Sequence, residues 1–282
     1  MILLGGHIAK YERNHVLNRR LFASLAVEHG IHRTRRARLR LVFSQLWAQT
    51  WQNVGVTDQT QATLGARLLA EGVGTAFLVA VVVGSGIMAQ RLSPNDAGLQ
   101  LLENAAATTG GLIALILALG PVSGAHFNPV VSLVTRLFGG LTNKELALYS
   151  IVQIVGGCVG AMIANIMFAH PFIEMSTKVR TGGPTWFSEV VATVGLLLII
   201  WGGKRAGANV AVLVAAWITG AYWFTSSTSV ANPAVGIGRM FSDSFAGIAP
   251  ESMPMFAVMQ ILGGVIGLLI IKTLWADSRA DS

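Results

Sequence analysis

The chain has 282 residues, of which 53% are hydrophobic and 12% charged, and its mean hydropathy is +0.61. Soluble domains carry about a quarter charged residues, so this composition excludes an ordinary water-soluble enzyme, a disordered regulator and a disulfide-rich secreted module. The single cysteine, Cys158, excludes an internal disulfide, and the dispersed histidines predict neither a metal site nor a cofactor. The chain is therefore predicted to reside in a lipid bilayer.

The net charge of +7 is concentrated near the N-terminus. Residues 1–60 contain nine lysines and arginines against three acidic residues, whereas the remainder contains 11 bases and 10 acids. A basic segment before a membrane span is typical of a cytoplasmic anchor, and we favour this interpretation over binding to nucleic acid. An incorrectly assigned start of the chain stays open as a third explanation. No apolar core with a cleavage site follows these charges, so no signal peptide is predicted.

Six apolar stretches are long enough to cross about 30 Å of hydrocarbon. They lie at residues 64–88, 98–119, 145–168, 186–203, 208–228 and 255–275. Helices are expected, because lipid leaves backbone groups without water and the chain lacks the alternating strands of a barrel. With the basic segment in the cytoplasm, 16 bases fall on the inner side and 4 on the outer side, which places both termini inside. The predicted organisation is a basic cytoplasmic arm at 1–60, a membrane domain at 61–275 and a cytoplasmic tail at 276–282.

The membrane domain contains an internal repeat. Segment 68–84 matches 186–202 at an offset of 118 residues, and segment 149–164 matches 256–271 at an offset of 107. Each half contains three spans, so the second copy enters the membrane from the opposite face, with a pathway expected between the halves. The two halves cover about residues 64–168 and 185–275. The repeated glycines are interpreted as close helix contacts.

A short apolar stretch with an Asn-Pro pair lies between the second and third spans of each half. These stretches are 123–138 (SGAHFNPVVSLVTRLF) and 227–241 (STSVANPAVGIGRMF). They are too short to span the membrane and too apolar for a solvated loop, so we expect half-helices that enter it and stop. Asparagine is a preferred N-cap residue, and proline is favoured at the first helical position.

These features resemble the aquaporin, or major intrinsic protein, family. The resemblance covers about residues 64–275 and rests on AEGVGT, SGAHFNPV, the Gln-Gly pattern of the third spans, and ANPAV. It implies an all-α membrane protein with six transmembrane helices and two re-entrant half-helices in an inverted repeat. The half-helix N-termini would face the centre of a narrow pore and repel cations and protons, while neutral hydroxylated solutes pass. The pore-centre residues that it implies are Asn128, Pro129, Val130, Asn232, Pro233 and Ala234. Valine replaces the family's alanine in the first motif, which we expect to alter half-helix packing more than chemistry.

In similar proteins a ring of four residues forms the narrowest part of the pore. Counting from the two asparagines, the resemblance assigns this ring to Thr108, Gly220, Ser229 and Val235. Water-selective members usually have an aromatic residue, a histidine and an arginine there, and this chain has none of them. Gly220 is typical of glycerol-conducting relatives, and Thr108 in place of an aromatic residue should widen the ring. Val235 in place of arginine removes a fixed charge and a hydrogen-bond donor. A wide, uncharged ring is therefore predicted.

Arg239 is a candidate for the missing cation. It lies four residues after Val235, about 6 Å further out on the same helix face, and helical side chains lean toward the N-terminus. We therefore consider that Arg239 lines the outer mouth of the pore. The alternative, slightly favoured on sequence alone, is that it pairs with Asp243 and with carbonyls at the end of the half-helix.

Three further polar residues fall within or beside apolar segments. Glu71 and Glu189 lie inside spans, where a charge is costly and often functional, for instance as a proton relay. In the family such glutamates accept hydrogen bonds from the re-entrant loops, so we favour a scaffold role for both. His126 either lines the cytoplasmic half of the pore or is a satisfied packing residue, and both interpretations stay open.

The predicted function is passive transport of small neutral solutes. The wide ring and the segments ANPAV and FSDSFAGIAP resemble bacterial aquaglyceroporins associated with arsenic resistance, which implies arsenite, antimonite and methylated arsenicals as solutes beside glycerol and water. A general glycerol, urea and water facilitator is the alternative, followed by a coupled secondary transporter. The chain contains neither an HExxH nor a GxSxG motif, so no enzyme activity is predicted. The resemblance implies a homotetramer in the bacterial inner membrane, with the bilayer and solutes as partners and no nucleic acid.

Overall fold

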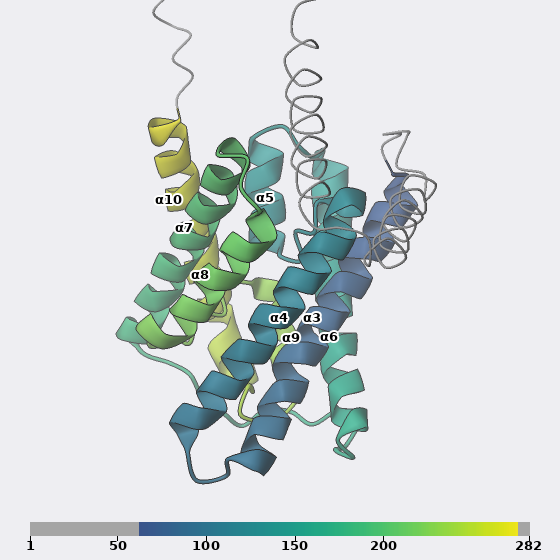
Figure 1. Cartoon of the computed structure of the whole chain (residues 1–282), viewed down its shortest axis with the longest axis vertical. Helices are drawn as coiled ribbons and strands as arrows, with labels where there is room; N and C mark the ends of the chain where they lie inside the picture. The colour runs from purple at the N-terminus through teal and green to yellow at the C-terminus, as the bar shows by residue number, and fades with distance from the viewer. Residues whose placement is uncertain (1–61, 276–282) are drawn as a thin grey trace, which may run out of the picture. The chain divides into compact units, whose positions relative to one another are not determined.

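The computed structural model describes residues 62–275, which fold into α-helices joined by loops, with no β-strand in this range (Figure 1). The elements in chain order are α3 (Leu64–Leu92), α4 (Ala97–Ser123), α5 (Pro129–Leu137), α6 (Asn143–Met167), α7 (Gly183–Arg205), α8 (Val210–Phe224), α9 (Pro233–Arg239), the 3-10 helix η1 (Pro250–Ser252) and α10 (Met253–Leu274). The predicted arm at 1–60 and tail at 276–282 lie outside the described residues.

Five of the six expected spans are helices long and apolar enough to cross a membrane, namely α3, α4, α6, α7 and α10 with η1. The sixth, expected over 208–228, is shorter: α8 has 15 residues, or about 22 Å of helix. It ends because Thr225 adopts extended backbone and its hydroxyl donates to the Ala221 carbonyl at 2.6 Å. The residues that follow are then available as a loop leading to the second Asn-Pro motif.

Both predicted half-helices are present. α5 has nine residues and α9 has seven, and each begins at the proline of an Asn-Pro pair. The Asn128 side chain accepts from the Val130 amide at 2.9 Å, and the Asn232 side chain accepts from the Ala234 amide at 3.0 Å. The N-cap and proline signals therefore determine where both helices start.

Within each half, glycines bring the first and third spans into close contact. A Cβ atom on Gly156 of α6 would lie 2.2 Å from the Gly72 carbonyl oxygen of α3, and one on Gly263 of α10 would lie 2.8 Å from the Val190 carbonyl oxygen of α7. No side chain fits in either place, so backbone meets backbone. This confirms the interpretation of the repeated glycines as helix contacts.

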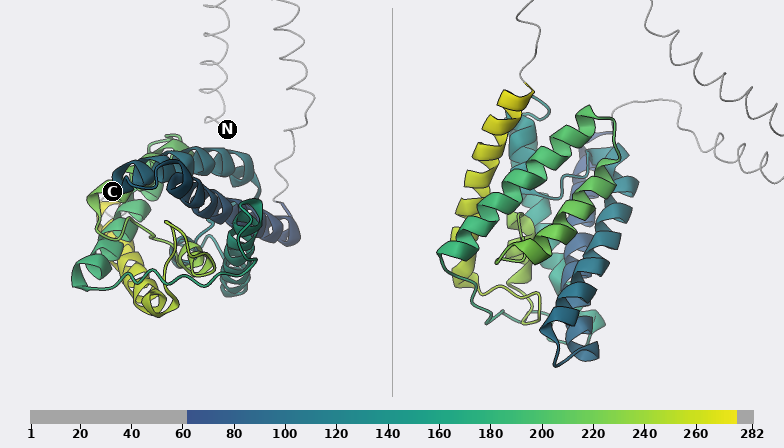
Figure 2. Two further views of the ribbon diagram at one scale, coloured as in Figure 1. Left: turned by 90° about the horizontal axis from the view of Figure 1, so that it is seen from below. Right: turned by 60° about the vertical axis from the view of Figure 1, so that its left-hand side comes forward.

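The helices form one bundle with the short helices α5 and α9 inside it (Figure 2). The first residues of α3 and the last residues of α10 lie at the same end of the bundle (Figure 1). The other end carries the long connections 168–182 and 240–252, and we call this end the loop-rich mouth. The two half-helices enter from opposite ends and meet midway, as the inverted repeat predicts.

Candidate functional site

The two Asn-Pro motifs meet at the centre of the bundle. Asn128 donates through Nδ2 to the Ala231 carbonyl at 2.7 Å, and Asn232 donates through Nδ2 to the Phe127 carbonyl at 2.7 Å. Each asparagine thus caps its own half-helix with its side-chain oxygen and bonds the opposite loop with its side-chain nitrogen. The positive ends of both half-helices consequently face each other at this point.

A cavity runs past the asparagines along the bundle. Its wall on α8 consists of residues spaced four apart, Val210, Val214, Ile218 and Tyr222, so one face of the helix lines it over its whole length. Lys204 borders it near the end where the described chain begins and ends, and Arg239 borders it toward the loop-rich mouth. Most of the remaining lining is aliphatic. The polar lining residues are Thr108, His126, Asn128, Ser229 and Asn232.

Glu71 holds the first re-entrant loop. Its carboxylate is fully buried and accepts from the amides of His126 at 2.9 Å and Phe127 at 2.7 Å. Ser123 Oγ and Gln153 Nε2 donate to the same carboxylate at 2.6 and 2.8 Å. Glu71 is absent from the cavity wall, and four donors occupy it, which favours the scaffold interpretation over a proton relay.

Glu189 does the same for the second loop. It is fully buried and accepts from the amides of Val230 at 2.9 Å and Ala231 at 2.8 Å, and from Gln260 Nε2 at 2.6 Å. The glutamates and glutamines that align in the internal repeat therefore perform equivalent structural tasks. The spacing itself differs between the halves: Glu71 lies 55 and 82 residues before His126 and Gln153, whereas Glu189 lies 41 and 71 residues before Val230 and Gln260. The equivalence of the two glutamates therefore comes from the fold.

Both loops carry strained backbone at equivalent positions. The residues one and three before each asparagine have positive φ although none is glycine: Ala125 at 48° and Phe127 at 47°, Ser229 at 52° and Ala231 at 47°. Such conformations are unfavourable for side chains with a Cβ atom and persist only where surrounding contacts impose them. The hydrogen bonds to the two buried carboxylates supply those contacts.

His126 lies in the cavity wall. Its Nδ1 atom is 3.1 Å from Ser132 Oγ, which in turn accepts from Gln153 Nε2 at 3.0 Å. Its ring also packs at a tilt against Tyr149, with 5.6 Å between ring centroids. His126 thus lines the cavity and is also held by packing, so its position is compatible with both interpretations.

Three of the four predicted ring residues, Thr108, Ser229 and Val235, line the cavity. Gly220 does not: it is exposed, and a Cβ atom there would meet nothing within 4 Å. Tyr222 lines the cavity instead, and its hydroxyl lies 3.2 Å from Thr108 Oγ1. The assignment of Gly220 to the ring is therefore wrong. Two residues turn a helix by about 200°, so Gly220 lies on the face of α8 opposite Tyr222. The four-residue spacing along this helix would have identified Tyr222.

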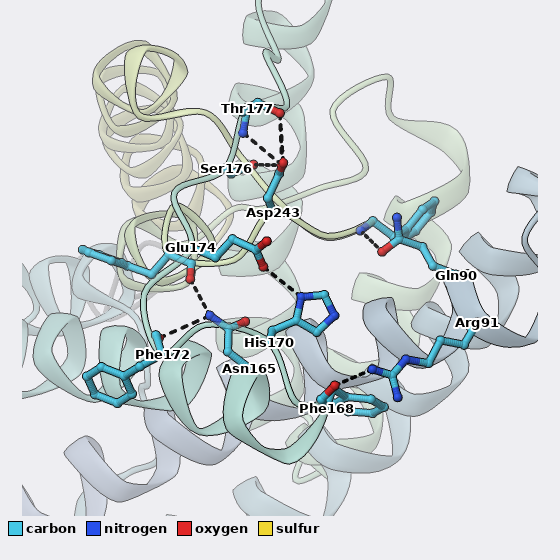
Figure 3. Close-up of polar contacts among 12 residues, drawn as sticks. Gln90, Arg91, Asn165, Phe168, His170, Phe172, Glu174, Ser176, Thr177 and Asp243 are labelled. Carbon is cyan, nitrogen blue, oxygen red and sulfur yellow. Dashed lines mark hydrogen bonds and ion pairs between the residues drawn. The ribbon is translucent and has the colours of Figure 1, made fainter.

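Arg239 is 4% exposed and lines the cavity one turn beyond Val235. Its Nε atom donates to the Ala246 carbonyl of the loop that follows α9. The alternative ion pair with Asp243 does not form, because that carboxylate accepts from the Thr177 amide at 3.0 Å and from Ser176 Oγ at 3.4 Å (Figure 3). The geometry therefore favours the position at the pore mouth for Arg239.

The loop 168–182 contributes contacts that the sequence did not indicate. Arg180 donates through Nη1 to Thr228 Oγ1 at 3.2 Å, beside the ring residue Ser229, and through Nε to the Gly247 carbonyl at 3.0 Å. Asn165 at the end of α6 donates to the Phe241 carbonyl at 2.8 Å. These bonds tie three separate loops together around the loop-rich mouth.

A bundle in which two capped half-helices meet inside a lined cavity defines a membrane channel built on re-entrant loops. Residues 59–216 match the family described as Major intrinsic protein, and the chain belongs to this family, whose members are channels rather than enzymes. It is an integral membrane protein with the aquaporin-like fold.

Two relatives and one solved structure illustrate the relationship. The chain is 48% identical to aquaglyceroporin AqpS of Rhizobium meliloti (strain 1021) over 217 residues, which cover 77% of this chain and 93% of that protein. It is 27% identical to aquaporin Z of Brucella melitensis biotype 1 over 226 residues, covering 74% and 97%. The X-ray structure of the aquaglyceroporin from Plasmodium falciparum has the same fold, with a TM-score of 0.55, 19% identity, and coverage of 77% and 98%.

Proposed function

We propose that this chain is a passive channel that conducts trivalent metalloid hydroxides together with glycerol and water. The observation that carries the proposal is the throat itself, where Thr108, Ser229 and Val235 line the cavity and no arginine follows the second asparagine at the ring position. The relative named an aquaglyceroporin at 48% identity supports solutes larger than water. Arsenite and antimonite are neutral at pH 7 and similar to glycerol in shape.

The cavity wall explains how such solutes are separated from ions. Aliphatic side chains offer an ion no replacement for its hydration shell, while the two asparagines and the Thr108 hydroxyl offer hydrogen bonds to solute hydroxyls. The facing N-termini of the half-helices add a positive potential midway along the path. Neutral polyhydroxylated solutes therefore meet the lowest barrier.

Tyr222 modifies the expected width of the throat. Its ring occupies a side of the cavity that Gly220 was expected to leave open, and its hydroxyl bonds Thr108. The throat then combines apolar surface, from Val235 and the Tyr222 ring, with the hydroxyls of Thr108 and Tyr222. This amphipathic section matches a solute such as glycerol, which carries carbon on one side and hydroxyls on the other.

The direct test compares water, glycerol and trivalent arsenic uptake in proteoliposomes by stopped flow. Val235→Arg should reduce glycerol and arsenite uptake at least tenfold while water flux changes little, because a long charged side chain narrows the ring. Val235→Leu is the matched control, since it adds volume without charge. Identical metalloid uptake in Val235→Arg and the parent would contradict the assignment of the ring.

Urea separates this proposal from its nearest alternative, a general glycerol, urea and water facilitator. A channel that passes urea as fast as glycerol and rejects arsenite is the facilitator. A coupled transporter is less well supported, because the two buried carboxylates are saturated with donors and lie away from the cavity. Accumulation of any solute against its gradient would nevertheless identify one.

We further propose a homotetramer with one pore per subunit in the bacterial inner membrane and with both termini in the cytoplasm. The basic segment 1–60 supports this orientation through the positive-inside rule, and both ends of the described chain lie on one side of the bundle. The loop-rich mouth then faces outward. Val179 is 54% exposed in that mouth. The cysteine of a Val179→Cys variant should therefore react with a membrane-impermeant thiol reagent added outside intact cells.

A further inference from the structure

Three cations surround the loop-rich mouth and share one short stretch of backbone as their hydrogen-bond acceptor. This stretch is 245–247, in the loop between α9 and η1. Lys178 Nζ donates to the Phe245 carbonyl at 2.9 Å. Arg180 donates through Nη2 to the same carbonyl at 3.2 Å and through Nε to the Gly247 carbonyl at 3.0 Å. Arg239 donates through Nε to the Ala246 carbonyl. All three positive charges are therefore held by neutral dipoles.

None of these three cations forms an ion pair with a carboxylate within the described residues. Ion pairs in 62–275 are confined to Arg67 with Glu145 and His170 with Glu174, and neither involves the mouth cations. Asp243 is near, but its oxygens accept from Ser176 and Thr177. Burial, followed by repulsion from the two arginines, lowers the pKa of Lys178 to about 8, against a smaller opposing attraction from Asp243. The mouth thus carries three cations, none of which is paired directly with a carboxylate.

Arg239 is the member of this cluster that faces the pore. Its side chain is 4% exposed, and Nε has a partner, but within the described residues neither Nη atom donates a hydrogen bond. A buried guanidinium is costly unless an anion or several acceptors satisfy it. Because the residue lines the cavity, its remaining N–H groups are available to a ligand there.

A second donor faces the same cavity. Thr108 and Tyr222 share one hydrogen bond at 3.2 Å, and neither hydroxyl has another described partner. Two hydroxyls that share one bond use one of their two hydrogens, so one O–H stays free to donate. The cavity wall therefore presents donors from Arg239 and from the hydroxyl pair, and no described carboxylate lines it.

We propose that the loop-rich mouth is a binding site for a small monovalent carboxylate, anchored by Arg239 and assisted by the Thr108 and Tyr222 hydroxyl pair. A planar carboxylate matches the fork of a guanidinium and forms two parallel bonds with it. The anion occupies the solute path, so it competes with neutral solutes that enter from this mouth. Its binding goes beyond the proposed conduction and does not depend on which neutral solute passes.

Thermal unfolding of the purified full chain tests binding directly, with formate as the probe at constant ionic strength and a bulky sulfonate as the replacement anion. The parent should show a saturable rise in Tm of a few degrees, since a ligand that binds only the folded state stabilises it. In Arg239→Gln the rise should require at least about tenfold more formate, as expected for loss of a charged fork. An equal rise in the parent and in Arg239→Gln would overturn the proposal.

Two further variants guard this test. Arg136→Gln is the matched control, because Arg136 bonds Asn143 at the far end of α6 from the mouth, and it should respond to formate like the parent. If Arg239→Gln fails to fold, the double variant T108V/Y222F, which removes only the assisting hydroxyls, should still shift formate binding severalfold. Unchanged binding in that variant would remove the hydroxyl pair from the site.

Solute flux gives an independent readout. Formate added at the loop-rich side should slow glycerol uptake by the parent in a saturable way, at the concentrations that raise Tm, and should not slow uptake by Arg239→Gln. Absence of any glycerol flux would refute the proposed function while leaving the Tm result intact. Saturable stabilisation without inhibition would place the anion outside the solute path and overturn that part of the inference.

Discussion

Single side chains determine the chemistry of the throat, and their roles depend on what else they touch. Arg239 has a neutral carbonyl as its only described partner and lies in the cavity wall. Glu71 and Glu189 have three or four donors each and lie outside that wall. A buried charge that is saturated with hydrogen bonds supports structure, whereas one with spare donors at a cavity is available to a passing molecule.

Arg239→Ala is predicted to change selectivity more than folding. Loss of the positive charge at the mouth should raise cation leakage and alter glycerol uptake severalfold, because the electrostatic barrier there is reduced. Solute uptake and sodium flux in proteoliposomes measure both effects, with Arg136→Ala as the control for loss of an arginine elsewhere. Unchanged flux for every solute would leave Arg239 a purely structural role.

Glu189→Gln is predicted to destabilise the second re-entrant loop by about 2–4 kcal/mol. The amide substitute loses the charge that strengthens bonds from Val230, Ala231 and Gln260, and its own N–H groups face donors. Unfolding in detergent should show this loss, together with reduced glycerol flux. Glu251→Gln, at an exposed position in η1, should change neither. Wild-type stability in Glu189→Gln would show that the carboxylate does not hold the loop.

At the scale of the elements, close backbone contact between helices is what the glycines provide. α3 and α6 approach so closely that carbonyl oxygens of one occupy the space of a Cβ on the other. The half-helices α5 and α9 depend on this packing, since nine and seven residues are too few to form stable helices alone. Their caps set where they start, and the surrounding bundle keeps them folded.

Gly156→Ala is predicted to cost about 1–3 kcal/mol, because the added methyl would lie 2.2 Å from the Gly72 carbonyl oxygen and the helices must separate. Gly110→Ala on α4 is the matched control: nothing lies within 4 Å of its added methyl, so no loss is expected. Thermal unfolding of both variants measures the difference. Equal stability of the two would mean that the α3 and α6 contact tolerates a methyl group.

At the scale of the whole molecule, every residue that lines the described cavity lies between Leu78 and Arg239, within the part of the chain that the structure describes. The alignment with the relative of 48% identity spans 217 residues, which are 93% of that protein and 77% of this chain. The channel is therefore the part that the two proteins share. The role of the basic segment stays a prediction, either as an anchor at anionic lipid or as a nucleic-acid binding segment.

Removal of residues 1–60 is predicted to leave glycerol flux per assembled channel unchanged, because both Asn-Pro motifs and the residues that line the described cavity lie between Leu78 and Arg239. Flux in proteoliposomes, normalised to the amount of inserted protein, checks this. Binding of a 1–60 peptide to vesicles with anionic lipid, compared with duplex DNA, then separates the two roles. A truncated channel that inserts but does not conduct would show that residues 1–60 are needed for conduction.

The sequence by itself determined the helical membrane class, the inverted repeat and the starts of both half-helices. These features depend on hydropathy over about 20 residues and on local capping, which operate within short stretches of chain. The repeat also aligned Glu71 with Glu189, and the family resemblance indicated that both glutamates hold the re-entrant loops.

Only the tertiary structure decided which side chains form the throat and its mouth. Whether Gly220 or Tyr222 faces the cavity depends on the rotation of α8 against its neighbours, and counting from Asn232 cannot supply it. Asp243 bonds Thr177 and Arg180 bonds Thr228, so their partners lie 66 and 48 residues away in the chain. Such contacts follow from how loops of the two halves converge on one end of the bundle, a property of packing over long range that no local pattern encodes.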